Sequence, residues 1–178
     1  MKRYFFFVGF CVMALQAVGQ KYTLEKSVIT FFSDATIEDI AATNKKATSI
    51  FNAEASEIAF SVPINEFQFE KKLMQEHFNE KYMESEKFPK ATFAGTISGF
   101  DLKATGAQQA KASGKLTIHG VTKTVDIPGT AEVQSGNIIL KAKFIVKLAD
   151  YNIKIPQLMW QNIAEQVEVT VDFTYKPQ

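Results

Sequence analysis

The side chains best suited to chemistry are few in this 178-residue sequence: His77 and His119 are its two histidines, and Cys11 is its one cysteine. A protein-bound zinc ion usually takes three or four His, Cys or carboxylate ligands at short spacings. The two histidines stand 42 positions apart, and the sequence contains no such cluster. We therefore predict no metal site.

Carboxylate pairs are the next candidates, because two neighbouring carboxyl groups can divide the roles of general acid and general base. Glu54 with Glu57, and Glu84 with Glu86, have suitable spacing, but solvated loop charges are the more frequent reason for such pairs. The sequence also lacks the G-x-S-x-G elbow, the P-loop and the dinucleotide-binding glycine fingerprint. We predict no catalytic residue and no cofactor.

Both histidines fit structural positions. His77 lies on the apolar side of a segment in which large side chains recur at three- and four-residue spacing among charged ones: Phe69, Leu73, Met74, His77, Phe78 and Tyr82. This spacing predicts one amphipathic helix over about residues 70–85, with His77 partly buried, ending before Pro89. His119 lies in Thr-Ile-His-Gly-Val-Thr-Lys at residues 117–123, which predicts a tight reversal between two strands.

The elements that would position these side chains are mainly strands. Apolar and polar residues alternate with a period of two in three segments, 58–65, 140–148 and 166–175. Pro63 indicates a sheet edge or a bulge in the first of them, and residues 103–113 are interpreted as an exposed hairpin loop. Weaker alternation predicts further strands at residues 26–32, 47–54, 90–99, 111–119 and 122–133.

Eight such strands predict an antiparallel sheet, because parallel strands are covered on both faces and form continuous apolar runs. Closing the sheet into a barrel removes both unpaired edges. We therefore predict an all-β, eight-stranded antiparallel barrel with the helix at about residues 70–85 between strands, where it would plug or flank one end; a sandwich is the alternative. The interior of an eight-stranded barrel is either just filled or holds one small ligand, and periodicity alone favours the filled core.

The N-terminus predicts a secretory signal peptide at residues 1–19. Lys2 and Arg3 precede an apolar run of about 12 residues, shorter than the roughly 20 that a membrane span needs, and Ala17-Val18-Gly19 supplies small residues for peptidase cleavage. Cleavage would leave one domain, residues 20–178, without cysteine and with 18 of the 20 basic side chains against 19 acidic ones. This near-neutral balance predicts no nucleic-acid partner. We expect a periplasmic or secreted protein without a stable membrane anchor.

Three further motifs carry a resemblance to a known family. They are Phe-Pro-Lys-Ala-Thr-Phe at residues 88–93, Gly-Lys-Leu-Thr-Ile-His-Gly-Val-Thr-Lys at 114–123 and Asp-Tyr-Asn-Ile at 150–153. In order and spacing they resemble the YceI-like family of exported lipid-binding proteins, over essentially all of residues 20–178. The resemblance implies a lipocalin-like antiparallel barrel with a long apolar tunnel for a polyisoprenoid or another long-chain amphiphile, and it implies no catalytic residues.

The sequence departs from the family pattern at two places. Residues 25–31 lack the histidine that is common near the start of the family's domain, so the preference for a ligand head group is open. Tyr151 is followed by Asn152 where the family commonly has glycine, and asparagine can also adopt the positive φ that a glycine would supply.

The resemblance favours a tunnel over a filled core. We predict an exported binding or carrier protein for a long-chain apolar ligand, such as a polyisoprenoid, a quinone tail or a fatty acyl chain, with the oligomeric state left open. A structural or stress-protective barrel with a filled core is the first alternative, and an enzyme acting on lipid inside the barrel is the second. The predicted tunnel lining consists of Phe60, Val62, Phe93, Ile97, Leu116, Ile118, Phe144, Val146, Val169, Val171 and Phe173.

Overall fold

The computed structural model describes residues 21–34, 39–155 and 164–178, and the predicted signal peptide lies outside them. The described residues form ten strands, one short α-helix and three helical turns. The strands are β1 (Lys21–Ser33), β2 (Ile40–Asn44), β3 (Thr48–Asn52), β4 (Glu57–Pro63), β5 (Gln68–Phe69), β6 (Lys90–Ser98), β7 (Gly106–Ile118), β8 (Val121–Gln134), β9 (Asn137–Lys147) and β10 (Gln166–Pro177). The helical elements are η1 (Ile64–Glu66), α1 (Lys72–His77), η2 (Phe78–Tyr82) and η3 (Leu148–Tyr151).

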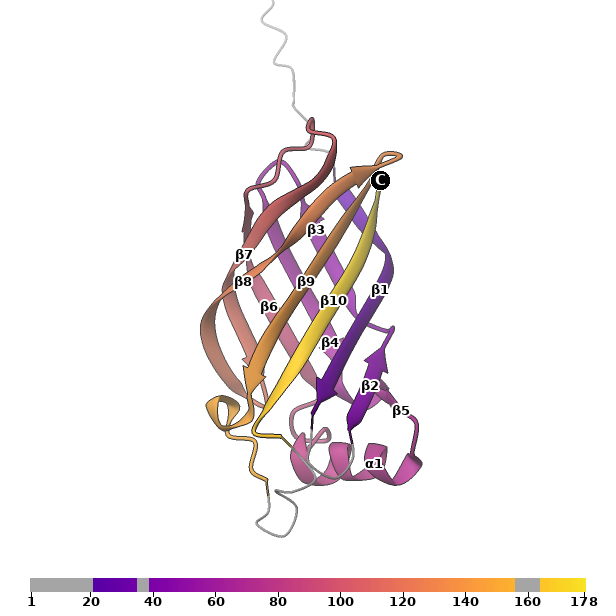
Figure 1. Cartoon of the computed structure of the whole chain (residues 1–178), viewed down its shortest axis with the longest axis vertical. Helices are drawn as coiled ribbons and strands as arrows, with labels where there is room; N and C mark the ends of the chain where they lie inside the picture. The colour runs from indigo at the N-terminus through magenta and orange to yellow at the C-terminus, as the bar shows by residue number, and fades with distance from the viewer. Residues whose placement is uncertain (1–20, 35–38, 156–163) are drawn as a thin grey trace, which may run out of the picture.

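Eight of these strands close into an antiparallel barrel (Figure 1). Around the barrel the order is β1, β10, β9, β8, β7, β6, β4 and β3, and β3 pairs back onto β1. The long first and last strands seal the barrel, because β1 pairs with β10 from Tyr22↔Pro177 to Phe32↔Glu168. The prediction of an eight-stranded antiparallel barrel is confirmed, and the sandwich alternative is wrong.

The other two strands, β2 and β5, form a short extension beside β1. β3 pairs with residues 21–23 of β1 and β2 pairs with residues 29–33, so the two strands share one side of β1. Asn44 separates them: its buried side chain donates a hydrogen bond to the carbonyl oxygen of Pro63 (2.8 Å) and accepts one from the N–H of Lys46 (2.8 Å). β2 is not among the predicted strands, because small and polar side chains replace the alternating apolar pattern there.

The predictions for Pro63 and for the loop at residues 103–113 have different outcomes. β4 ends at Pro63, beyond the last residue that pairs with β3, Ser61, so Pro63 pairs with β6 alone and its predicted edge position is confirmed. The predicted loop is wrong from Gly106 onward, where β7 begins and pairs with β8. Small and polar side chains occupy this part of β7, so its pattern resembles that of a loop.

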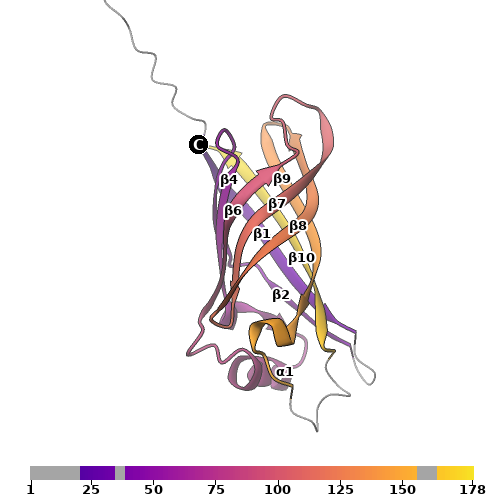
Figure 2. The same cartoon turned by 90° about the vertical axis from the view of Figure 1, so that its left-hand side faces the viewer.

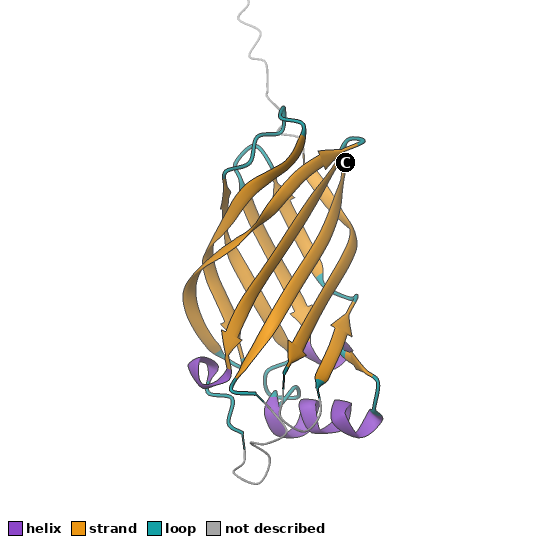
Figure 3. Cartoon of the chain, viewed as in Figure 1, coloured by secondary structure: helices purple, strands orange, loops and turns teal. Residues whose placement is uncertain are grey.

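Helix α1 lies across one end of the barrel, the lower end in Figures 1 and 2. It continues into η2 through a π-type turn, in which the N–H of Met83 donates to the carbonyl oxygen of Phe78 at 2.8 Å. The predicted helix is therefore confirmed in position, with helical residues from 72 to 82. The turn η3 lies at the same end, and strands form the rest of the wall (Figure 3). This end is termed the helix end below, and the opposite one the far end.

Large aromatic side chains fill the interior from the middle of the barrel toward the far end. Phe51, Phe93, Phe173 and Tyr175 are at most 2% exposed. Ring centroids lie 5.6 Å apart for Phe51 and Tyr175, and 6.1 Å apart for Phe173 and Tyr175. The Tyr175 hydroxyl forms a 2.6 Å hydrogen bond with the Ser49 hydroxyl, so the buried polar group of this layer is paired. This part of the barrel is a close-packed core.

Gly95 and Gly114 face each other across β6 and β7 and bring the two backbones very close together. A Cβ atom at Gly114 would lie 2.3 Å from the carbonyl oxygen of Ala94 and 2.6 Å from the Cα of Gly95. No side chain fits in this space, so the two positions require glycine. Such glycine pairs allow the strands to bend around a barrel.

Candidate functional site

The barrel is hollow toward the helix end. A cavity of about 380 Å³ lies there, bounded by the strand walls and by α1, η2 and η3. Its size falls in the lower part of the roughly 300–1,000 Å³ range of sites for small organic ligands. The described residues that line it are Ile29, Phe31, Ser33, Ile40, Phe60, Val62, Ile64, Phe67, Phe69, Leu73, Met74, His77, Phe78, Tyr82, Met83, Ala91, Leu116, Ile118, Phe144, Val146, Leu148, Ile153, Val167, Val169 and Val171.

The lining is almost entirely apolar. No Asp, Glu, Lys or Arg side chain is among the described lining residues, and Ser33, His77 and Tyr82 supply the polar groups. The Ser33 hydroxyl accepts a hydrogen bond from the N–H of Ala164 at 3.1 Å. Burial raises the pKa of the Tyr82 hydroxyl above its ordinary value, so this group stays a neutral donor. The cavity thus combines an apolar interior with a few hydrogen-bonding groups at the helix end.

The exposure of inward-facing side chains shows where the empty space ends. Ile118, Phe144 and Val169 line the cavity and are only half-buried, because empty space adjoins them. Phe93 and Phe173 also face inward, but neighbouring rings cover them completely. Inward-facing residues therefore belong to two regions, one hollow and one packed.

The structure divides the eleven residues of the predicted tunnel lining between these regions. Eight border the large cavity: Phe60, Val62, Leu116, Ile118, Phe144, Val146, Val169 and Val171. The other three, Phe93, Ile97 and Phe173, border a second void of about 60 Å³ nearer the far end. That any of the eleven contacts a ligand stays a prediction.

Several lining residues were not among those predicted. Ile29 and Phe31 of β1 and Ile40 of β2 contribute to the wall, as do Ile64 and Phe67 near η1. The apolar face of the predicted helix could have identified further lining residues, because every member of that face borders the cavity: Phe69, Leu73, Met74, His77, Phe78 and Tyr82. His77 is half-buried as predicted, but it faces the cavity rather than a packed core.

Phenylalanine side chains join the helix to the barrel wall. The Phe78 ring stacks on that of Phe31 of β1, with centroids 5.4 Å apart and planes 18° apart. It also lies 5.0 Å from the ring of Phe69 and 5.6 Å from that of Phe67. Aromatic pairs of this kind contribute about 0.5–1.5 kcal/mol each beyond their burial. The helix is therefore a fixed part of the cavity wall.

The strands β8 and β9 separate beside the cavity. Their pairing runs from Gln134↔Asn137 to Gly129↔Ala142 and ends there. Toward the helix end β8 continues to pair with β7, and β9 with β10, while β8 and β9 diverge from each other (Figure 2). Pro128, which has no N–H to donate, is the first residue of β8 beyond the last pair. This divergence is termed the β8–β9 fork.

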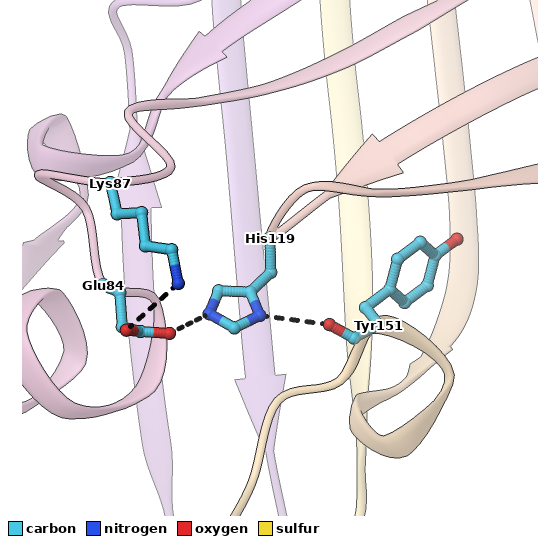
Figure 4. A network of polar contacts seen from close by, with 4 residues as sticks. All are labelled: Glu84, Lys87, His119 and Tyr151. Carbon is cyan, nitrogen blue, oxygen red and sulfur yellow. Dashed lines mark hydrogen bonds and ion pairs between the residues drawn. The ribbon is translucent and has the colours of Figure 1, made fainter.

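Polar contacts join the two sides of the fork at the helix end. Nζ of Lys123 on β8 lies 2.9 Å from Oδ1 of Asp150 in η3. Next to this ion pair, the His119 ring lies between two acceptors (Figure 4): Nδ1 is 3.2 Å from the carbonyl oxygen of Tyr151, and Nε2 is 2.9 Å from Oε2 of Glu84. Both contacts are satisfied together when each ring nitrogen carries a proton. The His119 side chain is 8% exposed, so it ties three segments together from a buried position.

The backbone around His119 matches the sequence prediction. His119 and Gly120 form the two-residue turn between β7 and β8, with φ of 49° and 75°. Gly120 packs against Phe88, because a Cβ atom there would lie 2.5 Å from Cε1 of that ring. The Phe88 and His119 ring centroids are 4.4 Å apart. Asn152 has a φ of 56°, the positive value expected of it.

The described residues were also searched for carboxylate pairs in the cavity, for metal-ligand clusters and for helices that could span a membrane. Neither the Glu54–Glu57 pair nor the Glu84–Glu86 pair lines the cavity. Across the three described ranges, no three His, Cys, Asp or Glu side chains are grouped so that they could hold a metal ion. Within the same ranges, no helix is both long and apolar enough to cross a membrane.

A family model described as the YceI-like domain matches residues 21–175. The chain belongs to the YceI-like family. The three motifs through which the sequence resembles this family meet at one corner of the structure. Phe88 of the first motif packs on His119 of the second, and His119 and Lys123 of the second contact Tyr151 and Asp150 of the third. In this YceI-like chain the motifs therefore hold the cavity wall together at the fork.

Solved structures with the same fold include three proteins of low sequence identity. A polyisoprenoid-binding domain from Saccharophagus degradans implicated in plant cell wall breakdown has a TM-score of 0.75 at 18% identity, covering 88% of this chain and 98% of its own. BcnA of Burkholderia cenocepacia has a TM-score of 0.70 at 17% identity, covering 83% and 95%. The YceI protein of Campylobacter jejuni has a TM-score of 0.57 at 15% identity, covering 100% and 99%. No curated protein matches the chain.

Proposed function

We propose that this YceI-like protein is an exported carrier that binds one long-chain apolar ligand in the cavity at the helix end. The observation that carries the proposal is the cavity of about 380 Å³ with its apolar lining. Protein interiors rarely contain voids larger than a water molecule. A fold that needed only stability would close such a space, as the far end of this barrel does.

The lining favours an amphiphile with an apolar tail. The tail would lie against the strand walls with its end toward Phe60, and a polar head group would lie near His77 and Tyr82 at the helix end. Burial of the tail would drive binding at about 25 cal/mol per Å² of apolar surface, less the cost of ordering the chain. Prenyl chains, quinone tails and fatty acyl chains have this chemistry. The Saccharophagus degradans relative is named for polyisoprenoid binding, which supports the same class.

Binding is favoured over catalysis. Among the described lining residues His77 and Tyr82 are the titratable ones, and no carboxylate lies beside either of them in the wall. A reaction on a bound lipid would need a pair of titratable groups aimed at the same atom. The filled-core alternative describes the far end of the barrel, and the cavity argues against it for the helix end.

Export is the second part of the proposal. The predicted signal peptide at residues 1–19 supports it, as does a remaining domain of residues 20–178 that contains no cysteine. N-terminal sequencing of the protein recovered outside the cytoplasm should begin at Gln20. An intact Met1 on the recovered protein would contradict this part.

Extraction of the natural ligand tests the carrier proposal. The full chain is expressed with its own leader, purified without detergent and extracted with organic solvent, and the extract is analysed by lipid mass spectrometry. The expected result is about one apolar chain per protein, and native mass spectrometry should show the same mass bound. Protein that is consistently empty, and that takes up no N-phenyl-1-naphthylamine when offered it, would support the filled-core alternative instead.

A further inference from the structure

The cavity ends at a layer of three side chains in the middle of the barrel. Phe60, Phe144 and Val171 border the large cavity on one side and the 60 Å³ void on the other. Beyond this small void the interior is filled by the aromatic rings of the far end. The three side chains are therefore the floor of the cavity.

The cavity is short along the barrel. On β10 its wall consists of Val167, Val169 and Val171, and on β9 of Phe144 and Val146, followed by Leu148 in η3. Three alternate residues span four residue steps, about 13 Å along a strand at roughly 3.3 Å per residue. The depth of this strand-walled part along the barrel axis is smaller still, because barrel strands are tilted. The space suits a short tail rather than a chain that runs through the whole barrel.

Phe60 is held in the floor by two buried rings. It stacks on Phe93 with centroids 5.2 Å apart and planes 18° apart. It meets the edge of Phe173 at 5.5 Å and 82°. Phe93 is 2% exposed and Phe173 is 1% exposed, and the void of about 60 Å³ beside them is too small to receive either ring. Phe60 is therefore held in place as a barrier at this end of the cavity.

We propose that Phe60 sets the ligand length of this protein, so that among long-chain amphiphiles the cavity accepts one with a prenyl or acyl tail of about farnesyl length and excludes polyprenyl chains. This inference rests on the proposed carrier function and narrows its ligand class. Removing the Phe60 ring would connect the cavity with the void that Ile97, Ala112 and Ile127 border on the far side. The connected space would admit a longer tail.

A prenol series tests the length limit. The mature protein, freed of lipid, is loaded with N-phenyl-1-naphthylamine, a compact apolar fluorophore that the floor does not exclude. The fluorophore is then displaced by farnesol, geranylgeraniol or solanesol, with three, four and nine isoprene units. The unmodified protein should bind farnesol most tightly and solanesol about tenfold more weakly or worse, since a tail that does not fit leaves apolar groups in water. Phe60→Leu should shift the preference toward geranylgeraniol by about tenfold relative to farnesol.

Matched variants separate the floor from the rest of the barrel. Phe100→Leu makes the same change at a ring that borders neither the cavity nor the small void, so it should leave the ratio between the prenols unchanged. Circular dichroism and thermal unfolding establish that each variant is folded, and Phe60→Met replaces Phe60→Leu if the latter does not fold.

Two results would overturn the length limit: equal affinity of the unmodified protein for farnesol and solanesol, or an unchanged prenol ratio in a folded Phe60 variant. If the carrier function itself is wrong, the experiment gives a different result. In that case neither the folded unmodified protein nor Phe100→Leu takes up N-phenyl-1-naphthylamine or any of the prenols.

Discussion

Nζ of Lys123 lies 2.9 Å from Oδ1 of Asp150, and this ion pair joins β8 to η3 across the β8–β9 fork. The two side chains are 39% and 49% exposed, so the pair is worth only about 0.2–1 kcal/mol. The ion pair nevertheless connects β8 to η3 where no backbone pairing does so, because the pairing of β8 with β9 has ended at Gly129↔Ala142. Side chains, and not a backbone ladder, hold the cavity wall together here.

A charge exchange tests this role. Lys123→Asp and Asp150→Lys each place like charges at the fork, and each should lower the free energy of unfolding by up to about 1 kcal/mol. Amide hydrogen exchange should become faster in residues 121–128. The double variant restores an opposite-charge pair and should recover both properties. A double variant whose loss equals the sum of the two single losses would show that the side chains do not interact in solution.

His119 should matter more than its ionic neighbours. His119→Asn retains a residue that tolerates positive φ but removes the contacts with Glu84, Phe88 and the Tyr151 carbonyl, so we expect a loss of about 1–3 kcal/mol in urea unfolding. The control is Lys87→Gln, because Nζ of Lys87 is 4.0 Å from Glu84 and its side chain is 68% exposed. That change should stay within about 0.5 kcal/mol. Equal losses of unfolding free energy in the two variants would show that the His119 contacts do not stabilise the fold.

The hollow and packed regions should respond differently to enlarged side chains. Ile118→Trp extends into the cavity, so it should leave the melting temperature almost unchanged while weakening the uptake of farnesol. Ala131→Leu adds bulk to a residue that is 0% exposed in the packed region, and overpacking there should cost about 1–3 kcal/mol. Similar melting temperatures for the two variants would mean that the two regions are packed alike.

A pair of neighbours on β9 tests the register of the wall. Phe144→Asp places an unpaired charge in the apolar interior and should cost at least about 3 kcal/mol or prevent folding. Lys143 points outward and lies 2.7 Å from Glu168, so Lys143→Gln should change the unfolding free energy by less than about 1 kcal/mol. Chemical denaturation measures both. A severe effect of Lys143→Gln would require a different register.

Tyr175 should make the fold sensitive to alkaline pH. Burial raises the pKa of its hydroxyl above the ordinary value of 10.0, so the folded protein holds this proton more tightly than the unfolded chain does. The contribution to stability is complete below about pH 10 and declines above it, as the unfolded chain loses the proton first. Tyr175→Phe should reduce this decline in urea titrations across that range. A residual decline is expected, because burial also raises the pKa of Tyr82 and of Tyr151. An unaltered slope in the variant would contradict the assignment.

The fold was predictable because the barrel wall has an apolar inner face and a polar outer face. Each long strand alternates between a wet and a dry face, so segments such as 140–148 and 166–175 indicate both strand type and inward residues. The short strand β2 gives no such signal, since Ala41, Ala42 and Asn44 lack the bulk that makes a pattern visible.

The candidate site was predictable only in part. Alternation identifies an inward face, but Phe60 and Phe173 have equivalent patterns although one borders the large cavity and the other lies in the packed region. Whether space near a side chain is filled depends on rings from distant strands, as when Phe60 contacts Phe93 of β6 and Phe173 of β10. The meeting of residues 88, 119 and 151 likewise depends on the closed topology, because their spacing along the chain contains no information about contact.

The packed region has a consequence for the proposed carrier function. Local opening free energies vary within one protein, and the regions with dense apolar contacts open last. In this chain the dense contacts lie around Phe51, Phe173 and Tyr175, away from the cavity. Ligand binding would add stability by mass action, whereas these packed contacts are made within the chain itself. A carrier of the proposed kind would therefore deliver its cargo, persist while empty and be loaded again, without refolding between cycles.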